Sequence, residues 1–309
     1  MPTALITGAT GLLGRQVLKA FEDADWQTVG TGFHRATGPI RKVDITDSGS
    51  VAALFDEVKP DVVVHCAADR QPDSCTKNPA AARALNVTAT QTLVEAFHGS
   101  LFIYISTDYV FPGAVGDAPY KSTDTPNPTN VYGQTKLDGE NVVLQHAQNN
   151  AVVLRVPVLY GSGAHSESAV NTLIDSLYGQ NRTVKMDDWA LRYPTNTEDV
   201  ARVCLDLAKK RTTQQKEGEG GEGKPMPNIL QFSSEDKMTK YEICQKFSEI
   251  MGLPIDHLVP DKDGGKPKDG TMRPYDCHLD TSGLKDLGVD VSTVDFVAWW
   301  RRYVGAFRH

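Results

Sequence analysis

Strand-like and helix-forming stretches alternate through the first half of the chain. Short stretches at residues 3–7, 27–32, 62–68, 101–105 and 151–159 have the length and composition of buried strands. Helix-forming stretches such as Arg15–Phe21 lie between them. Strands that alternate with helices usually pair in parallel. This half therefore predicts an α/β fold, a Rossmann-type doubly wound parallel sheet.

A glycine-rich turn joins the first strand to the first helix. Gly8, Gly11 and Gly14 have the spacing that lets a backbone turn tightly, approach a pyrophosphate and pack helix on strand. The following helix supplies amide donors and the positive end of its dipole for phosphates. This turn predicts a dinucleotide-binding site.

The end of the second predicted strand indicates which dinucleotide binds. NAD-binding proteins carry an acidic residue there for the ribose 2′-hydroxyl, but no Asp or Glu occurs between Trp26 and Arg41. Arg35, with His34 beside it, can instead bind a 2′-phosphate, which favours NADP. The alternative is that Arg35 is a solvated loop residue.

Tyr132 and Lys136 are four residues apart on a predicted helix, so they share one face. We expect the cation to favour ionisation of the phenol and to make Tyr132 a general acid. Thr107 ends an apolar strand and can place its hydroxyl beside a substrate carbonyl. The three form a candidate catalytic set, although each motif alone also occurs on ordinary helices and turns.

The pattern changes after residue 160, where helices predominate. We expect a Rossmann domain that binds NADP over residues 1–160, rejoined by part of 195–235, and a smaller substrate-binding lobe with a C-terminal tail over 161–309. Residues 212–224 lack apolar periodicity, so we expect a mobile loop there. The expected helices are Ser168–Tyr178, Asp199–Lys209, Lys240–Met251 and Phe296–Tyr303.

Composition excludes several classes of function. A hydrophobic content of 40% in 309 residues supports a large core, and a net charge of −7 argues against nucleic acid as a partner. Apolar runs stay well below the ~20 residues that span a bilayer, so we expect no membrane association and a cytoplasmic location. The five cysteines lack metal-site spacing, so no metal is expected, and Cys66 and Cys204 fit the core.

The chain resembles the extended short-chain dehydrogenase/reductase superfamily, and within it the dTDP-4-dehydrorhamnose reductase-like branch, over essentially its whole length. This resemblance implies a reductase fold with an RmlD-like substrate-binding lobe. The strings that carry it are residues 106–111, Tyr132 with Lys136, and residues 193–195, 273–274 and 279–284.

Within that branch the chain resembles the family of regulatory beta subunits of methionine adenosyltransferase. Such a subunit binds NADP and modulates a separate catalytic subunit that makes S-adenosylmethionine. The strings are residues 64–70 with Pro72 and Asp73, 104–111, 131–140, 186–189 leading to Arg192, and 238–242. The family's cofactor contacts carry over to Thr10, Gly11, Leu12, Leu13, Phe33, His34, Arg35, Asp44, Ile45, Cys66, Arg70, Tyr132, Lys136 and Leu159.

Two classes of function remain open. The first is the regulatory subunit. The second is an NADPH-dependent reductase of a nucleotide-linked 4-keto-6-deoxysugar, because the complete set of Thr107, Tyr132 and Lys136 is not obviously needed for regulation. A redox sensor without partner or substrate is a third, minor alternative. A dehydratase is disfavoured, since those enzymes have a Glu where Tyr109 follows Thr107 and Asp108.

The C-terminus carries four aromatic residues and three arginines between Trp299 and His309, a composition typical of interfaces. Trp299 and Trp300 fit better as the inner face of a closing helix. Phe307–His309 lie beyond that helix. The resemblance implies that this tail enters a cleft of the methionine adenosyltransferase catalytic subunit.

Overall fold

The computed structural model describes residues 1–146, 150–178, 182–217, 226–264 and 271–305. Its centre is a parallel seven-stranded sheet with strand order β10-β6-β5-β4-β1-β2-β3. This order confirms the predicted doubly wound sheet, in which strands run outward from β1 in both directions. The strands are β1 (Thr3–Thr7), β2 (Gln27–Gly32), β3 (Arg41–Lys42), β4 (Val62–His65), β5 (Leu101–Thr107), β6 (Ala151–Val156) and β10 (Ile229–Gln231).

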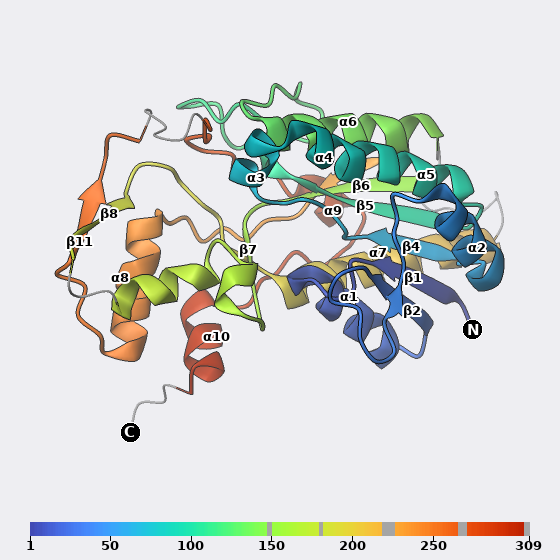
Figure 1. The fold of residues 1–309 in the computed structure, drawn as a ribbon, viewed down its shortest axis with the longest axis horizontal. Coiled ribbons are helices and arrows are strands. Elements are labelled where there is room, and N and C mark those ends of the chain that lie inside the picture. The colour runs from blue at the N-terminus through green and yellow to red at the C-terminus, as the bar shows by residue number, and fades with distance from the viewer. Residues whose placement is uncertain (147–149, 179–181, 218–225, 265–270, 306–309) are drawn as a thin grey trace.

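Helices cover both faces of this sheet (Figure 1). Both faces are apolar, because successive side chains of β1 point to opposite sides of the sheet. Ala4 and Ile6 pack into one apolar core, and Leu5 packs into the core on the other face. The first core is covered by α1 (Leu12–Asp23), α7 (Thr197–Glu217) and α9 (Ser282–Asp286), and the second by α2 (Ser48–Val58), α5 (Ala89–Ala96) and α6 (Val131–His146).

A second group of elements lies beside one end of the sheet (Figure 1). Its own core gathers the buried side chains of Tyr160, Leu177, Phe247 and Trp300. The elements of this lobe are β7 (Leu159–Tyr160), η4 (His165–Glu167), η5 (Asn171–Tyr178), β8 (Val184–Asp187), β9 (Thr195–Asn196), α8 (Lys240–Met251), β11 (Leu258–Asp261) and α10 (Phe296–Tyr303). The shorter elements elsewhere are α3 (Pro72–Lys77), α4 (Pro79–Arg83), η1 (Ala84–Thr88) and η2 (Asp108–Val110).

Two of the secondary-structure predictions for the chain after residue 160 were wrong. The helix expected at Ser168–Tyr178 is a 3₁₀ helix. It begins at Asn171, because the Ser168 hydroxyl accepts the Val170 and Asn171 amides and so ends the preceding turn. The expected loop at 212–224 is helical up to Glu217. No Gly or Pro interrupts the sequence before Gly218, and the Thr212 hydroxyl donates to the Ala208 carbonyl at 3.0 Å. Residues 218–224 lie outside the described part of the chain.

Part of the chain after residue 160 returns from the second lobe to the central sheet. After β9, α7 packs on α1 and β10 joins the edge of the central sheet. The division at residue 160 therefore stays a prediction about folding units. None of the helices in the described ranges combines the length and the apolar content that crossing a membrane would require.

The C-terminal helix α10 closes the second lobe. The exposed fraction is 5% for Trp299 and 0% for Trp300, and both rings contact Tyr160. This confirms their interpretation as the inner face of a closing helix. Phe307–His309, the residues expected to leave the body of the protein, lie outside the described residues.

Candidate functional site

The glycine-rich turn lies between β1 and α1 and allows very close backbone contacts. Gly8 has φ +67°, and a Cβ there would lie 2.7 Å from the Ala67 nitrogen. A Cβ on Gly14 would lie 2.2 Å from the Gly8 carbonyl oxygen. Side chains at these two positions would force the turn open, away from β4 and off the start of α1. The backbone of the turn and the N-terminus of α1 therefore face a cavity.

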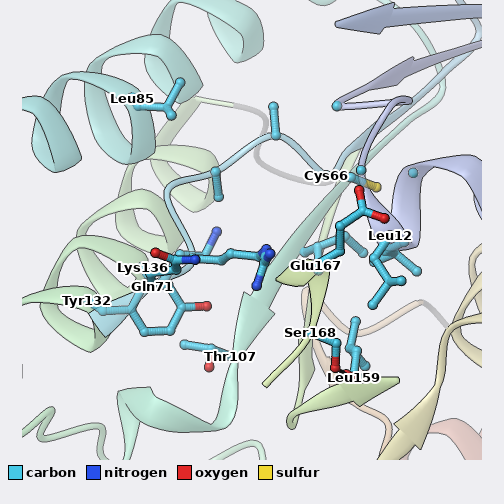
Figure 2. Close-up of a pocket in the computed structure, with 18 of the residues that line it drawn as sticks. Leu12, Cys66, Gln71, Leu85, Thr107, Tyr132, Lys136, Leu159, Glu167 and Ser168 are labelled. Atoms are coloured by element: carbon cyan, nitrogen blue, oxygen red, sulfur yellow. Dashed lines mark hydrogen bonds between the residues drawn. The ribbon is translucent and has the colours of Figure 1, made fainter. Parts of the chain in front are cut away.

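Two glycines seat α6 against the end of β5. A Cβ on Gly133 would lie 2.1 Å from the Tyr109 carbonyl oxygen, and one on Gly139 would lie 2.2 Å from the Tyr104 hydroxyl. The Asn130 side chain accepts the Gly133 amide and caps the helix. This close packing brings Tyr132 and Lys136 to the carboxyl end of the sheet. There the Tyr132 ring points toward Thr107, and all three residues line the cavity (Figure 2).

Burial controls the protonation of Tyr132 and Lys136. It raises the pKa of the Tyr132 phenol, and the Thr107 hydroxyl offsets part of that rise. It lowers the pKa of the Lys136 ammonium to about 7, against the opposing effect of Glu140. The expectation that Lys136 drives ionisation of Tyr132 does not match this environment. The phenol keeps its proton at neutral pH, as a proton donor must.

A cavity of about 1040 Å³ brings the predicted residues together. It runs from the glycine turn, past the ends of β2 and β4, to Thr107 and α6. Every candidate named from the sequence lines it: Gly8, Thr10, Gly11, Leu12, Leu13, Gly14, Phe33, His34, Arg35, Asp44, Ile45, Cys66, Arg70, Thr107, Tyr132, Lys136 and Leu159.

Cys66 lines this cavity and also packs against the edge of the core on the α1 face of the sheet. Its residue is only partly buried, whereas Cys204 is fully buried between α7 and the sheet. Cys66 directly follows the last residue of β4, so the chain is already leaving the sheet there. Burial raises the pKa of the Cys66 thiol to about 12, so it is protonated at neutral pH.

The cavity has a cationic end that sequence reasoning did not assign. Arg192, Lys240 and Arg273 line it beyond Tyr132. Burial and the two neighbouring guanidiniums lower the pKa of Lys240 to about 8. Arg273 donates to Asp73 at 2.6 Å. Arg192 and Arg273 stand in strings that carried the family resemblance, which was the only signal available for them.

Arg15 and Glu167 were also missed. Glu167 lies on η4, opposite Tyr132 and near Leu12 in Figure 2. Arg15 donates a hydrogen bond to each carboxylate oxygen of Glu167, at 3.1 and 2.8 Å. Arg35 forms a second ion pair with the same carboxylate. Nothing in the sequence near Glu167 predicts this position, because its partners are more than 130 residues away.

The chain was compared with known proteins. The family model described as the RmlD substrate binding domain matches residues 2–301. Methionine adenosyltransferase 2 subunit beta from Mus musculus is 43% identical over 292 residues, which are 94% of this chain and 83% of that protein. The chain belongs to the family of these beta subunits, within the RmlD group. The beta-subunit resemblance stated from the sequence is thereby confirmed.

Two solved structures share the fold of this family member. A dTDP-4-dehydrorhamnose reductase from Clostridium acetobutylicum is 26% identical, with a TM-score of 0.81 and 98% of both chains covered. The dTDP-4-dehydrorhamnose reductase from Bacillus anthracis, solved in complex with NADP, has a TM-score of 0.78 over 98% of both chains. At 22% identity, this second likeness is one of fold alone.

Proposed function

We propose that this chain is the NADP-binding regulatory beta subunit of a methionine adenosyltransferase and modulates S-adenosylmethionine synthesis by a separate catalytic subunit in the cytoplasm. The observation that carries the proposal is the 43% identity to a beta subunit over 94% of the chain. A likeness that extends over both lobes favours a shared role more strongly than one confined to the nucleotide-binding turn.

The lining of the cavity supports NADP as the cofactor. Gly8 and Gly14 hold the turn tightly against β4 and α1, and α1 presents its N-terminus to the cavity, where the pyrophosphate would bind. Arg35 follows the end of β2, and the sequence between Trp26 and Arg41 holds no Asp or Glu to bind a ribose 2′-hydroxyl. Bound NADPH would supply a hydride, and Tyr132 and Lys136 would hold its nicotinamide ribose.

We assign binding of the catalytic subunit to the C-terminal tail. α10 is anchored by Trp299 and Trp300, while Tyr303 at its end is 41% exposed. The chain therefore reaches the surface of the second lobe with a fixed direction before the tail begins. A short tail held by a rigid helix loses less conformational entropy on binding than a free one.

The second candidate function is reduction of a nucleotide-linked 4-keto-6-deoxysugar. It is favoured by the location of Thr107, Tyr132 and Lys136 in one cavity with a cationic end that suits a diphosphate. Tyr132 would donate the proton, Lys136 would orient the ribose and Thr107 would bind the carbonyl oxygen. General acid catalysis of this kind contributes ~10² to 10⁴ in rate.

One paired experiment separates the two functions. The purified chain is mixed with a methionine adenosyltransferase catalytic subunit and tested for co-purification, in parallel with NADPH oxidation on dTDP- and UDP-4-keto-6-deoxyglucose. The proposal predicts co-purification and no NADPH oxidation. Turnover of either sugar without binding to the catalytic subunit would replace the regulatory function with the reductase.

A further inference from the structure

Residues 161–168 form a strap that follows β7 and lines the cavity across from α6. The Glu167 side chain on this strap is only 12% exposed. A Cβ on Gly163 would lie 2.5 Å from the Arg15 guanidinium and 2.6 Å from the Glu167 carboxylate. Glycine at 163 therefore lets the strap lie directly on these two charged groups.

Arg15 anchors the Glu167 carboxylate. Besides its two bonds to Glu167, Arg15 donates to the Thr10 carbonyl at 2.8 Å and to the Ser162 carbonyl at 3.1 Å. The Ala164 amide donates to Glu167 at 3.1 Å. Hydrogen bonds from Arg15, followed by those from Arg35, lower the pKa of Glu167 to about 2. The carboxylate is therefore ionised at all physiological pH values.

Arg35 is the second partner of Glu167 and is held much more loosely. Its side chain is 57% exposed, and its guanidinium lies 3.9 Å from a Cβ built on Gly11 in the phosphate-binding turn. Two guanidiniums thus share one carboxylate. Glu167 and Ser162 on the strap accept three hydrogen bonds from Arg15, so Arg35 can leave Glu167 for another anion without disturbing this anchor.

We propose that Glu167 is a specificity-determining residue that occupies Arg35 in place of the ribose 2′-phosphate and has to release it when NADP binds. The inference rests on the proposed binding of NADP. A 2′-phosphate carries more negative charge than a carboxylate and so is the stronger partner for Arg35. NAD has no such group and leaves the pair of Glu167 and Arg35 intact. Glu167 therefore weakens binding of NADP more than binding of NAD.

The expected size of the effect follows from the exposure of Arg35. The loss of an ion pair this exposed changes a binding constant about two- to fivefold. Glu167→Gln keeps an oxygen that accepts from Arg15 but removes the charge that competes for Arg35. It should raise NADP affinity about two- to fivefold and NAD affinity by less. Glu167→Ala should change NADP affinity in the same direction.

The test is a set of calorimetric titrations with NADP, NAD and 2′,5′-ADP on the full chain. Glu167→Gln is compared with the unmutated chain and with Arg35→Ala and the double variant. Asp175→Asn is the matched control, because it removes a carboxylate from neighbouring η5 that pairs with His165 and not with Arg15 or Arg35. Melting temperatures establish that each variant is folded.

The inference predicts a gain for NADP and 2′,5′-ADP that disappears when Arg35 is already alanine. An equal gain for NADP and NAD, a loss of NADP affinity, or a gain that persists without Arg35 would overturn it while leaving NADP binding itself in place. Failure of the unmutated chain to bind either dinucleotide would instead overturn both this inference and the proposed cofactor.

Discussion

The Thr107 hydroxyl donates a hydrogen bond to the Asp108 carboxylate, with 3.0 Å between Oγ1 and Oδ1. The same hydroxyl accepts the Tyr109 amide at 3.2 Å. Its proton therefore points to Asp108 while this carboxylate is ionised. Burial raises the pKa of Asp108 to about 7, so the orientation of this hydroxyl depends on pH near neutrality.

The raised pKa of Asp108 predicts a pH dependence of stability. The folded chain holds a proton on Asp108 that the unfolded chain loses near pH 4, so stability falls as pH rises from about 4 to about 7. Asp108→Asn should remove this component, which reaches about 4 kcal/mol at about 1.4 kcal/mol per pKa unit. Urea unfolding at pH 4.5 and 8 measures it. Equal pH dependence in both proteins would contradict the buried, proton-binding carboxylate.

Arg35→Ala is expected to erase most of the preference for NADP over NAD. A lost hydrogen bond between charged groups weakens NADP binding by roughly 1.5 to 3 kcal/mol, whereas NAD makes no such bond. Arg41→Ala is a matched control, because Arg41 pairs with Glu57 outside the cavity. Calorimetry with both dinucleotides decides the matter. Equal affinities in the unmutated chain would show that Arg35 does not bind a 2′-phosphate.

Tyr132→Phe separates regulation from chemistry. Phenylalanine keeps the ring packed against Tyr109 but removes the proton donor. Regulation of the catalytic subunit should survive the change. Any NADPH oxidation on a 4-keto-deoxysugar should collapse by ~10² or more. Tyr178→Phe, at an exposed position, is the control. A loss of regulation with Tyr132→Phe alone would mean that the phenol serves the regulatory function itself.

The buried ion pair of Glu140 and Arg155 should be essential for stability. Both side chains are at most 2% exposed, and their nearest atoms are 2.7 Å apart. Glu140→Gln leaves a buried guanidinium without its counter-charge and should cost about 3 to 5 kcal/mol. Glu95→Gln, in an exposed pair with His146, should cost less than about 0.5 kcal/mol. Urea midpoints compare the two, and equal losses would argue against this account of Glu140.

Local sequence signals predicted the fold and the main lining of the cavity. The glycine turn and the pair Tyr132 and Lys136 depend on residues close together in sequence, and their geometry follows from one turn and one helix. The parallel sheet could be predicted too, since strands that alternate with helices usually pair in parallel. These features require no knowledge of distant contacts.

Other features depend on contacts between distant residues. Glu167 reaches the cavity only because η4 folds over α1, and Arg35, its partner, lies on a separate loop. The pKa of Tyr132 follows burial, which a pair spacing does not encode. The extent of α7 was missed because polar Thr and Gln residues lack apolar periodicity, although they are compatible with a helix.

Deleting Gly305–His309 should abolish binding to the catalytic subunit. The truncated chain still contains Trp299 and Trp300, which close the second lobe, so its melting temperature and NADP affinity should be unchanged. Size-exclusion chromatography of the mixed proteins provides the measurement. Co-elution of the truncated chain at full strength would show that the tail is not the anchor.

The central claim is that this chain modulates a methionine adenosyltransferase. The most direct measurement is the initial rate of S-adenosylmethionine formation by a purified catalytic subunit, at several methionine concentrations, as this chain is added. The account predicts a saturable change in KM or kcat that reaches its limit at a fixed ratio of the two proteins and is absent with the chain truncated before Gly305. Rates that stay constant at every ratio, with a folded chain that binds NADP, would contradict it.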